Sequence, residues 1–366
     1  MALVSGADRR TGWVWHPRYA EHDAGLDFGP WVAPGASFES PAGKQRFADL
    51  VETSGLIEAL VPLPVSPVSE VDLLRVHDSA YVARVQALSD GDGGDAGDFC
   101  HVGRGSFEIA QLAAGGTYAA VSAVLTGEVR NAYALVRPAG HHAEAARGRG
   151  YCIFGNIAVA VAKARAELDL RRVAVIDWDV HHGNGTEDMF RADPAVLTVS
   201  LHQDRLYPED SGAITSHASV VNIPLPPGCG WGAYFDAFTR LVLPALRDLR
   251  PDLIVVASGF DSGGLDPMGR MLLSASAFAR LTGLLMGAAE ELCDGRLVLS
   301  HEGGYSELHV PFCGVAVLEQ MSGARTSVED AFAWLDDDPY QALLDHQSAV
   351  VTAALAAWRA APHPVR

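Results

Sequence analysis

Two carboxylates and an imidazole follow apolar segments of the chain that have the composition of buried strands. Asp179 and His181 come directly after segment 172–177, and Asp261 comes after segment 252–258. Residues two apart on an extended backbone point the same way, so Asp179 and His181 can converge on one ion. Two Asp and one His without sulfur suit a divalent cation, and three protein ligands leave a position for water. The pattern therefore indicates a catalytic metal site, although an isolated D-x-H tripeptide could equally cap a loop.

Two further strand-like segments end in residues that could act beside such a metal. Segment 133–136 leads into Arg137-Pro-Ala-Gly-His141-His142, where adjacent imidazoles can supply a general base and an electrostatic partner for an activated water. Segment 296–300 leads into His-Glu-Gly-Gly304-Tyr305. Its glycines bring the backbone close to a ligand, and the Tyr305 hydroxyl can donate to a developing oxyanion. Tyr305 alone would also fit a packed aromatic residue whose hydroxyl is satisfied elsewhere.

Strand-like and helix-like segments alternate along the chain and would position these residues. The expected strands are 133–136, 172–177, 196–201, 220–223, 252–258 and 296–300, and the expected helices are 105–126, 156–168, 232–249 and 274–293. This alternation predicts an α/β fold with a mainly parallel sheet and helices on both faces. Ligands of such folds bind at the carboxyl ends of the strands, where the residues above fall.

The remaining segments give no sign of a second folding unit. We expect a single domain over residues 1–366, in which the Pro-rich segment 61–67 is a loop and a helical tail starts at about residue 327. A Gly/Asp-rich loop at 90–98 should lie on the surface, with Asp98 solvated rather than contacting a substrate. His22 is expected in a surface loop near the N-terminus, and Glu302 is expected to hold its own glycine turn.

Composition excludes several classes of protein. Hydrophobic residues make up 49% of the 366 residues, which is too apolar for disorder. With 27 basic against 45 acidic residues, the net charge of −18 opposes binding to nucleic acid or to an anionic membrane. Five scattered cysteines without a C-x-x-C pair suit a reducing compartment. With no apolar segment of about 20 residues, we expect a cytoplasmic protein that does not enter the membrane.

Six motifs, in order, carry a resemblance to a known family. They are R-P-A-G-H-H-A, G-Y-C-I-F-G-N, D-W-D-V-H-H-G-N-G-T, S-L-H-Q, G-F-D-S-G-G-L-D-P-M-G and H-E-G-G-Y-S. The chain resembles the zinc-dependent histone deacetylase superfamily from about residue 13 to about residue 323, and most of all its class II-like bacterial histone deacetylase-like amidohydrolases. The resemblance implies an arginase/deacetylase-like three-layer sandwich.

The resemblance also implies roles for individual residues. Zinc would be held by Asp179, His181 and Asp261, the three residues that spacing suggests. His142 would act as general base, held by Asn184, and His141 would support the transition state through its charge, backed by Asp177. Tyr305 would hold the oxyanion, and the family's structural potassium ion would lie near Asp177, Asp179, His181, Ser200 and Leu201.

A narrow tube would lead the substrate to the zinc. Tyr151, after Gly150, and Tyr207 replace the two Phe usual in its walls, and each adds a hydroxyl that could narrow the tube or bond a polar chain. Gly304 would bring the backbone to the substrate. Met268 stands at a rim position that is Glu in polyamine-selective relatives, so it gives no counter-charge for a second ammonium.

We therefore expect a zinc-dependent hydrolase that cleaves the amide of an N-acetylated or otherwise acylated lysine, or of a small acylated amine, by metal-activated water. Three alternatives stay open: an acetylpolyamine or other small-molecule amidohydrolase, a non-catalytic module that binds acyl-lysine, and an arginase-type binuclear manganese enzyme. The expected partner is an acylated lysine peptide or a small acylated amine, and fold-level analogy suggests a homo-oligomer.

Overall fold

A parallel β-sheet forms the centre of the protein. The computed structural model describes residues 10–25 and 37–361. The main sheet has eight strands in the order β10-β9-β8-β11-β12-β6-β1-β2, and every pair of neighbours is parallel. The strands are β1 (Thr11–Val14), β2 (Leu60–Pro62), β6 (Asn131–Ala134), β8 (Val173–Asp177), β9 (Val196–Gln203), β10 (Val220–Leu225), β11 (Leu253–Ser258) and β12 (Leu297–His301).

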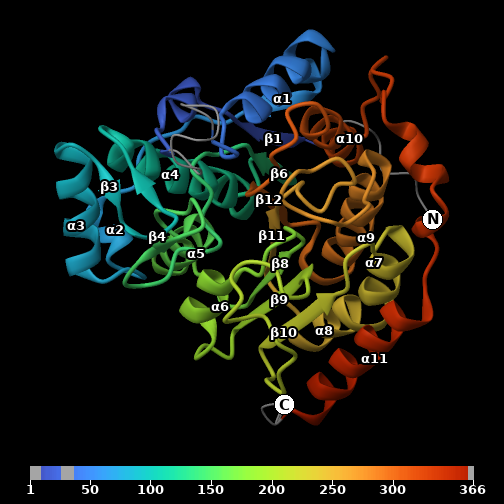
Figure 1. Ribbon diagram of the computed structural model, residues 1–366. Coiled ribbons are helices and arrows are strands. Elements are labelled where there is room, and N and C mark those ends of the chain that lie inside the picture. Colours follow the sequence, from blue (N-terminus) through green and yellow to red (C-terminus); the bar gives the residue numbers. More distant parts are fainter. Residues whose placement is uncertain (1–9, 26–36, 362–366) are drawn as a thin grey trace, which may run out of the picture.

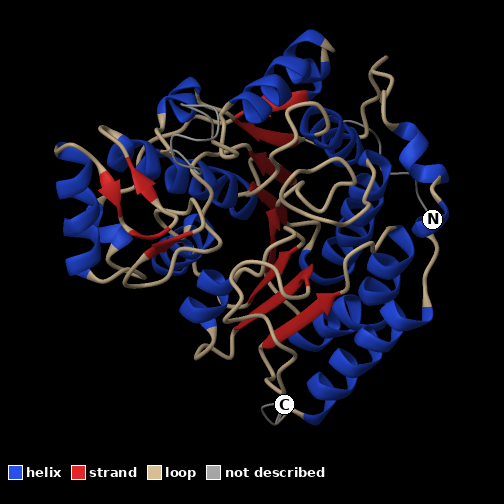
Figure 2. Ribbon diagram, viewed as in Figure 1, coloured by secondary structure: helices blue, strands red, loops and turns tan. Residues whose placement is uncertain are grey.

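Helices cover both faces of this sheet, as Figures 1 and 2 show. The α-helices are α1 (Ala42–Thr53), α2 (Glu70–Leu73), α3 (Ser79–Asp90), α4 (Ser106–Leu125), α5 (Asn156–Glu167), α6 (Asn184–Phe190), α7 (Trp231–Ala237), α8 (Leu243–Leu249), α9 (Ala275–Cys293), α10 (Val310–Ser322) and α11 (Asp345–Ala360). Helices α4 and α5 pack on one face, and α1 and α7 to α11 pack on the other.

Side chains that alternate along each strand build the two apolar cores between these layers. On β8, Val173 and Val175 face the α4/α5 side, whereas Ala174 and Ile176 face the other side. A strand that is apolar at every position is the kind that fits between two helical layers. The prediction of a three-layer α/β sandwich with a mainly parallel sheet is thus confirmed.

Several local predictions were wrong. Strands β1 and β2 extend one edge of the sheet, and β2 includes part of the segment 61–67 that was expected to be a loop. The expected helix 232–249 is interrupted by a π-helical turn at Phe238–Val242. The tail beyond residue 327 first forms 3₁₀ turns at Ala333–Asp337 and Pro339–Gln341, and its α-helix begins only with α11.

Smaller elements and the molecular surface complete the described structure. Two short pairs of strands, β3 (Gly94–Asp95) with β5 (His101–Val102) and β4 (Gly97–Asp98) with β7 (Gly148–Arg149), lie within a lobe beside α2 and α3.

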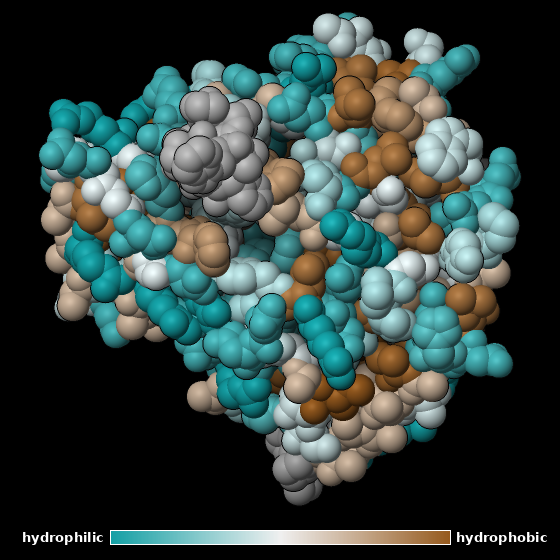
Figure 3. Space-filling view, viewed as in Figure 1, coloured by the Kyte–Doolittle hydropathy of each residue, from teal (hydrophilic) through white to brown (hydrophobic). Residues whose placement is uncertain are grey.

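All five cysteines are buried free thiols. Within the described residues no helix is long and apolar enough to cross a bilayer. In the face that Figure 3 draws, hydrophobic side chains form small groups between hydrophilic ones. That residues 1–366 form one domain stays a prediction.

A buried ion cluster ties the N-terminal segment to the loop after β6. The Arg137 guanidinium donates from Nε to both carboxylate oxygens of Glu39, at 3.0 and 2.8 Å, and from Nη1 to the carbonyls of Tyr19 and His22, both at 2.8 Å. Lys44 approaches the same carboxylate at 3.3 Å. His22 is buried, contrary to its expected surface position, and its Nδ1 lies 2.9 Å from the Ser106 hydroxyl. The cluster fixes the start of the loop that carries the histidine pair.

We predict that Glu39→Gln lowers the free energy of unfolding by about 3–5 kcal/mol, because it leaves two buried cations without a carboxylate. Burial raises the pKa of Glu39, but its ion pairs with Arg137 and Lys44 lower it to about 2. The stabilisation that Glu39 provides should therefore be complete above the usual glutamate pKa of 4.5, and it should disappear as the pH falls toward 2. Urea unfolding at several pH values measures both effects.

The control is Glu21→Gln, which removes an exposed pair with Arg18 and should change stability by less than about 1 kcal/mol. Equal effects of the two substitutions would contradict the importance of the buried cluster.

Candidate active site

Four neighbouring strands of the sheet deliver the candidate site residues. The order β8-β11-β12-β6 places the loops after these strands side by side at the carboxyl edge of the sheet. The loop after β8 carries Asp179 and His181, and the loop after β11 carries Asp261. The loop after β6 carries the histidine pair, and the loop after β12 carries Tyr305. His141 and Tyr305, which are 164 positions apart in the sequence, thus meet at one site.

The two carboxylates and the imidazole converge on one point. Nδ1 of His181 lies 3.0 Å from Oδ1 of Asp179 and 3.1 Å from Oδ2 of Asp261. The donor atoms of all three residues lie within 4.8 Å of one another, and all three side chains are buried. Among the described residues, no fourth donor joins this cluster. Within the described residues the cluster thus has three protein ligands, which suits one ion.

Backbone amides orient these carboxylates. Asp261 Oδ1 accepts from the amide of Val180 at 2.8 Å, and Asp179 Oδ2 accepts from the amide of Gly303 at 2.8 Å. Burial and the charge of Asp179 raise the pKa of Asp261 to about 8. Two buried carboxylates this close are stable in ionised form only beside a compensating charge. The donor set and its electrostatics fit a single divalent cation, with His181 presenting Nδ1 to it.

The two adjacent histidines have different partners, and their pKa values are shifted in opposite directions. His141 Nδ1 lies 2.9 Å from Asp177 Oδ2, and His142 Nδ1 lies 2.7 Å from Asn184 Oδ1. Burial lowers the pKa of His141, but the charges of Asp179 and Asp177 hold it well above its usual value. Burial and the nearby positive charge of His141 hold the pKa of His142 well below its usual value. The pair therefore offers one cationic and one neutral imidazole.

Two acidic residues fix the loops that carry these groups. Glu302 accepts from the amides of Gly140 and His141, at 2.6 and 3.1 Å, so it holds the histidine loop and not its own glycine turn as expected. Asp266 Oδ2 accepts from the amide of Tyr305 at 2.7 Å, and its Oδ1 accepts from the amide of Met268 at 2.9 Å. Asp266 carries no sequence signal for this role, because an Asp in a D-P-M-G turn is common on protein surfaces.

A tunnel of about 200 Å³ leads from the surface to this site. Its lining residues are Phe99, His142, Gly150, Tyr151, His181, Tyr207, Met268 and Tyr305. All of the expected substrate-binding residues except Gly304 line it. Gly304 instead turns the chain before Tyr305 with a φ of 128°, which only glycine adopts easily. Burial and the charges of Asp261 and Asp179 raise the pKa of Tyr305 well above its usual value, so its hydroxyl keeps its proton.

The mouth of the tunnel is braced by a single arginine. Arg149, of which 8% of the side chain is exposed, contacts Asp98 and Asp210, each at 3.2 Å. Its guanidinium lies 5.6 Å from the centre of the Tyr207 ring, and the Tyr207 hydroxyl donates to Asp98 at 3.0 Å. Asp98 was expected to be solvated, but it is held by Arg149 and Tyr207. The Tyr207 hydroxyl is thus engaged at the rim. Phe99, which the sequence analysis missed, lies at the same mouth with 61% of its surface exposed.

The residues expected near potassium lie beside the metal cluster. Strand register pairs Asp177 with Ser200, and Leu201 follows on β9. The Ser200 hydroxyl lies 2.9 Å from His202 Nδ1. The potassium site stays a prediction, since backbone carbonyls would supply most of its ligands.

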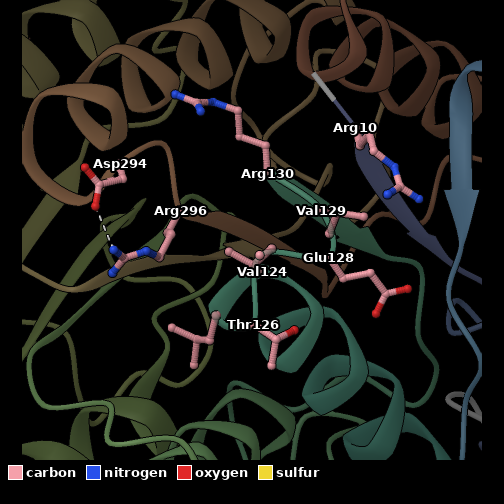
Figure 4. A pocket seen from close by; sticks show the side chains of 10 residues that line it. Arg10, Val124, Thr126, Glu128, Val129, Arg130, Asp294 and Arg296 are labelled. Atoms are coloured by element: carbon pink, nitrogen blue, oxygen red, sulfur yellow. Dashed lines mark hydrogen bonds and ion pairs between the residues drawn. The ribbon is translucent and has the colours of Figure 1, made fainter. Parts of the chain in front are cut away.

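A wider hollow of about 460 Å³ lies at the opposite, amino-terminal ends of β1, β6 and β12 (Figure 4). Arg10, Arg130 and Arg296 line it, and Arg296 is paired with Asp294 at 2.7 Å. Arg130 is paired with Glu290 outside the hollow. The lining contains no imidazole, thiol or phenol, whereas the histidine pair and Tyr305 lie at the other edge of the sheet.

The fold and the site together define an α/β protein of the arginase/deacetylase fold, with its polar cluster at the base of a narrow tunnel. The chain belongs to the histone deacetylase family, because residues 37–321 match the model of the histone deacetylase domain. It is accordingly a hydrolase of the deacetylase and amidohydrolase group. The resemblance inferred from the six sequence motifs is confirmed.

Individual relatives agree with this assignment. A histone deacetylase-like amidohydrolase of Pseudomonas aeruginosa is 48% identical over 326 residues, which cover 87% of this chain and 86% of the relative. The human polyamine deacetylase HDAC10 is 37% identical over 297 residues, which cover 75% of this chain and 43% of that protein. The crystal structure of the HDA15 HD domain superposes with a TM-score of 0.80 at 29% identity, covering 95% of this chain and 99% of that one.

We predict that Gly303→Ala weakens metal binding. An added Cβ would lie 2.2 Å from Asp261 Oδ2 and 2.6 Å from Asp179 Oδ2, so the two carboxylates would have to separate. We expect metal affinity to fall at least tenfold, measured by competition with a chromogenic chelator. Gly287→Ala on α9 is the control, because its Cβ would contact nothing within 4 Å, and it should keep full affinity. Unchanged affinity of Gly303→Ala would contradict the placement of the cluster.

Proposed function

We propose that the protein is a zinc-dependent deacylase that hydrolyses the amide of N-acetylated or otherwise acylated lysine, or of a related acylated amine. One observation carries this proposal: the Asp179, His181 and Asp261 cluster lies at the base of a tunnel into which a neutral imidazole and a protonated phenol also project. The aromatic walls of such a tunnel suit the alkyl chain of lysine. The general base, the oxyanion donor and the candidate metal are therefore accessible to one buried amide.

The expected metal is zinc, one ion per chain, held by Asp179, His181 and Asp261. Oxygen and nitrogen ligands without sulfur, three in number, suit a catalytic zinc with an open position. When bound, zinc would polarise the acyl carbonyl and lower the pKa of a coordinated water. Iron and other divalent cations accept the same ligands, so metal analysis of the purified protein identifies the ion.

The protein side chains then divide the proton transfers between them. His142, with Nδ1 bonded to Asn184, takes the proton of the attacking water on Nε2 and later passes it to the leaving amine. The Tyr305 hydroxyl donates to the oxyanion of the tetrahedral intermediate. His141, kept cationic by Asp177, adds positive charge beside the same intermediate. Tyr151 and Tyr207 exclude water along the alkyl chain of the substrate.

An acetylpolyamine substrate is the principal alternative. The similarity to a polyamine deacetylase favours it, but Met268 at the tunnel lining offers no carboxylate for a second ammonium. A non-catalytic acyl-lysine module would have no use for a neutral base and an oxyanion donor at the same cluster. Comparing the turnover of an acetyl-lysine peptide with that of N-acetylputrescine separates a lysine deacylase from a polyamine deacetylase. No hydrolysis of trifluoroacetyl-lysine at full zinc occupancy would support the non-catalytic module.

Three further expectations rest on the sequence and on the family. A potassium ion near Asp177 and Ser200 would stabilise the loop that holds the zinc ligands. A cytoplasmic location follows from the unpaired cysteines, and homo-oligomers are proposed by analogy with other proteins of this fold. Size-exclusion chromatography with light scattering measures the oligomeric state.

We predict that Tyr305→Phe lowers kcat by about ten- to a thousandfold, as expected for the loss of one oxyanion donor. Bound zinc and the melting temperature should stay the same, because the phenol contributes no bond to the metal cluster. The matched control is Tyr340→Phe, at a tyrosine that is 59% exposed and away from the tunnel, which should leave kcat unchanged. Wild-type turnover in Tyr305→Phe would refute the proposed role.

We also predict that Met268→Glu shifts selectivity toward acetylpolyamines. The new carboxylate at the tunnel lining would attract the distal ammonium, and we expect the ratio of kcat/KM for N-acetylputrescine over an acetyl-lysine peptide to rise about tenfold, or about 1.4 kcal/mol. Met268→Gln is the control, because glutamine has the size of glutamate but carries no charge. An equal shift with Gln would show that side-chain size, and not charge, sets the preference.

A further inference from the structure

Glu144 lies outside the tunnel but contacts the residue that holds the general base. It follows His142 by two positions and belongs to the loop between β6 and β7. Its Oε1 accepts a hydrogen bond from Nδ2 of Asn184 at 2.8 Å. Asn184 in turn holds Nδ1 of His142 at 2.7 Å. A chain of two hydrogen bonds therefore runs from a carboxylate at the protein surface to the proposed base.

The direction of these bonds is set by chemistry. A side-chain amide can rotate by 180° and exchange its oxygen and nitrogen, so Asn184 alone could either accept from His142 or donate to it. A carboxylate only accepts, and so does the carbonyl of His142, which lies 3.3 Å from the same Nδ2. With both acceptors on one side, Nδ2 must point to them and Oδ1 must face the ring. Nδ1 of His142 then carries the proton, and Nε2 is left free to accept one.

Two arginines hold Glu144 in this position. Arg147 donates from Nε to its Oε2 at 2.6 Å, and Arg149 donates from Nη1 to its Oε1 at 3.0 Å. Burial raises the pKa of Glu144, but hydrogen bonds from these two arginines lower it overall, so the carboxylate is ionised at neutral pH. Arg149 also binds Asp98 at the tunnel mouth, which links the orientation of Glu144 to the rim.

We propose that Glu144 is a positioning residue that fixes the amide of Asn184 and, through it, the ring nitrogen of His142 that carries the proton. The inference rests on the proposed function only in taking His142 as the general base. It explains why a neutral Asn suffices beside that base, because the negative charge that orients the amide lies one residue further away. Without Glu144, only the more distant carbonyl of His142 favours this orientation, so a fraction of the molecules would hold the flipped amide. The flipped amide donates to Nδ1 of His142 and leaves the proton on Nε2, where it blocks catalysis.

The test is a double-mutant cycle in the zinc-loaded full chain. Glu144→Leu removes the acceptor, and we expect kcat on an acetyl-lysine peptide to fall about tenfold. KM should change little, because Asp98 and Asp210 still hold Arg149 at the tunnel mouth. Asn184→Asp alone sets two carboxylates against each other and should also lower kcat. In the Asn184→Asp background, however, Glu144→Leu should raise kcat, because a carboxylate presents an acceptor oxygen in either orientation and the repulsion is gone.

A residue with only a structural role would lower kcat in both backgrounds, so the change in sign of the effect of Glu144→Leu identifies a positioning role. If Glu144→Leu lowers kcat by the same factor in both backgrounds, or has no effect in either, the proposal is overturned. Should Glu144→Leu unfold or lose zinc, Glu144→Met keeps an unbranched side chain without an oxygen acceptor and must show the same reversal. Glu167→Gln, at an exposed carboxylate that also accepts two hydrogen bonds, is the control and should leave kcat unchanged in both backgrounds.

A second readout does not depend on turnover. Nitrogen-15 NMR of the His142 ring, assigned by its loss in His142→Ala, should show the proton on Nδ1 in the wild type and a mixture of tautomers in Glu144→Leu. One unchanged tautomer in both proteins would overturn the inference. If instead His142→Ala hydrolyses substrate at the wild-type rate, the proposed function fails, whatever the NMR result.

Discussion

The structure depends on the burial of two negative charges side by side. Asp179 and Asp261 are both inaccessible to water, and each lies about 3 Å from the same nitrogen of His181. Charges in such surroundings need a compensating cation and fixed hydrogen bonds. The amides of Val180 and Gly303 supply the hydrogen bonds. The other groups of the site are arranged around this point. The pKa values of His141 and His142 shift in opposite directions, and one ring faces a carboxylate whereas the other faces an amide.

Much of the fold could be predicted from the sequence, because six strands are apolar at nearly every position and are separated by helical segments. Their order in the sheet was not predictable from the chain, yet it decides which loops meet. Strands β1 and β2 escaped prediction because they have only four and three residues and contain Gly12 and Pro62. Pro62 is tolerated because β2 is the edge strand of the sheet. The π turn in the segment 232–249 leaves no signal in an apolar helical sequence.

Some residues of the candidate site could be recognised in the sequence, and others could not. Histidine pairs, D-x-H and G-G-Y are uncommon combinations whose chemistry can be recognised locally, and the structure brings these residues together. Glu144, Arg149 and Asp266 are ordinary charged residues, and their importance comes from partners that only the fold supplies. Asp98 illustrates the difference: a Gly/Asp loop is typical of a solvated surface, yet Arg149, 51 positions away, draws its carboxylate to the tunnel mouth.

The central claim is that a single divalent cation is bound by Asp179, His181 and Asp261. The most direct measurement is anomalous X-ray scattering, recorded above and below the zinc edge, from crystals of the protein purified with its native metal. The account predicts one peak per chain, within bonding distance of both carboxylates and of Nδ1 of His181. Two peaks, a peak at any other place, or no peak in crystals of fully active enzyme would contradict it.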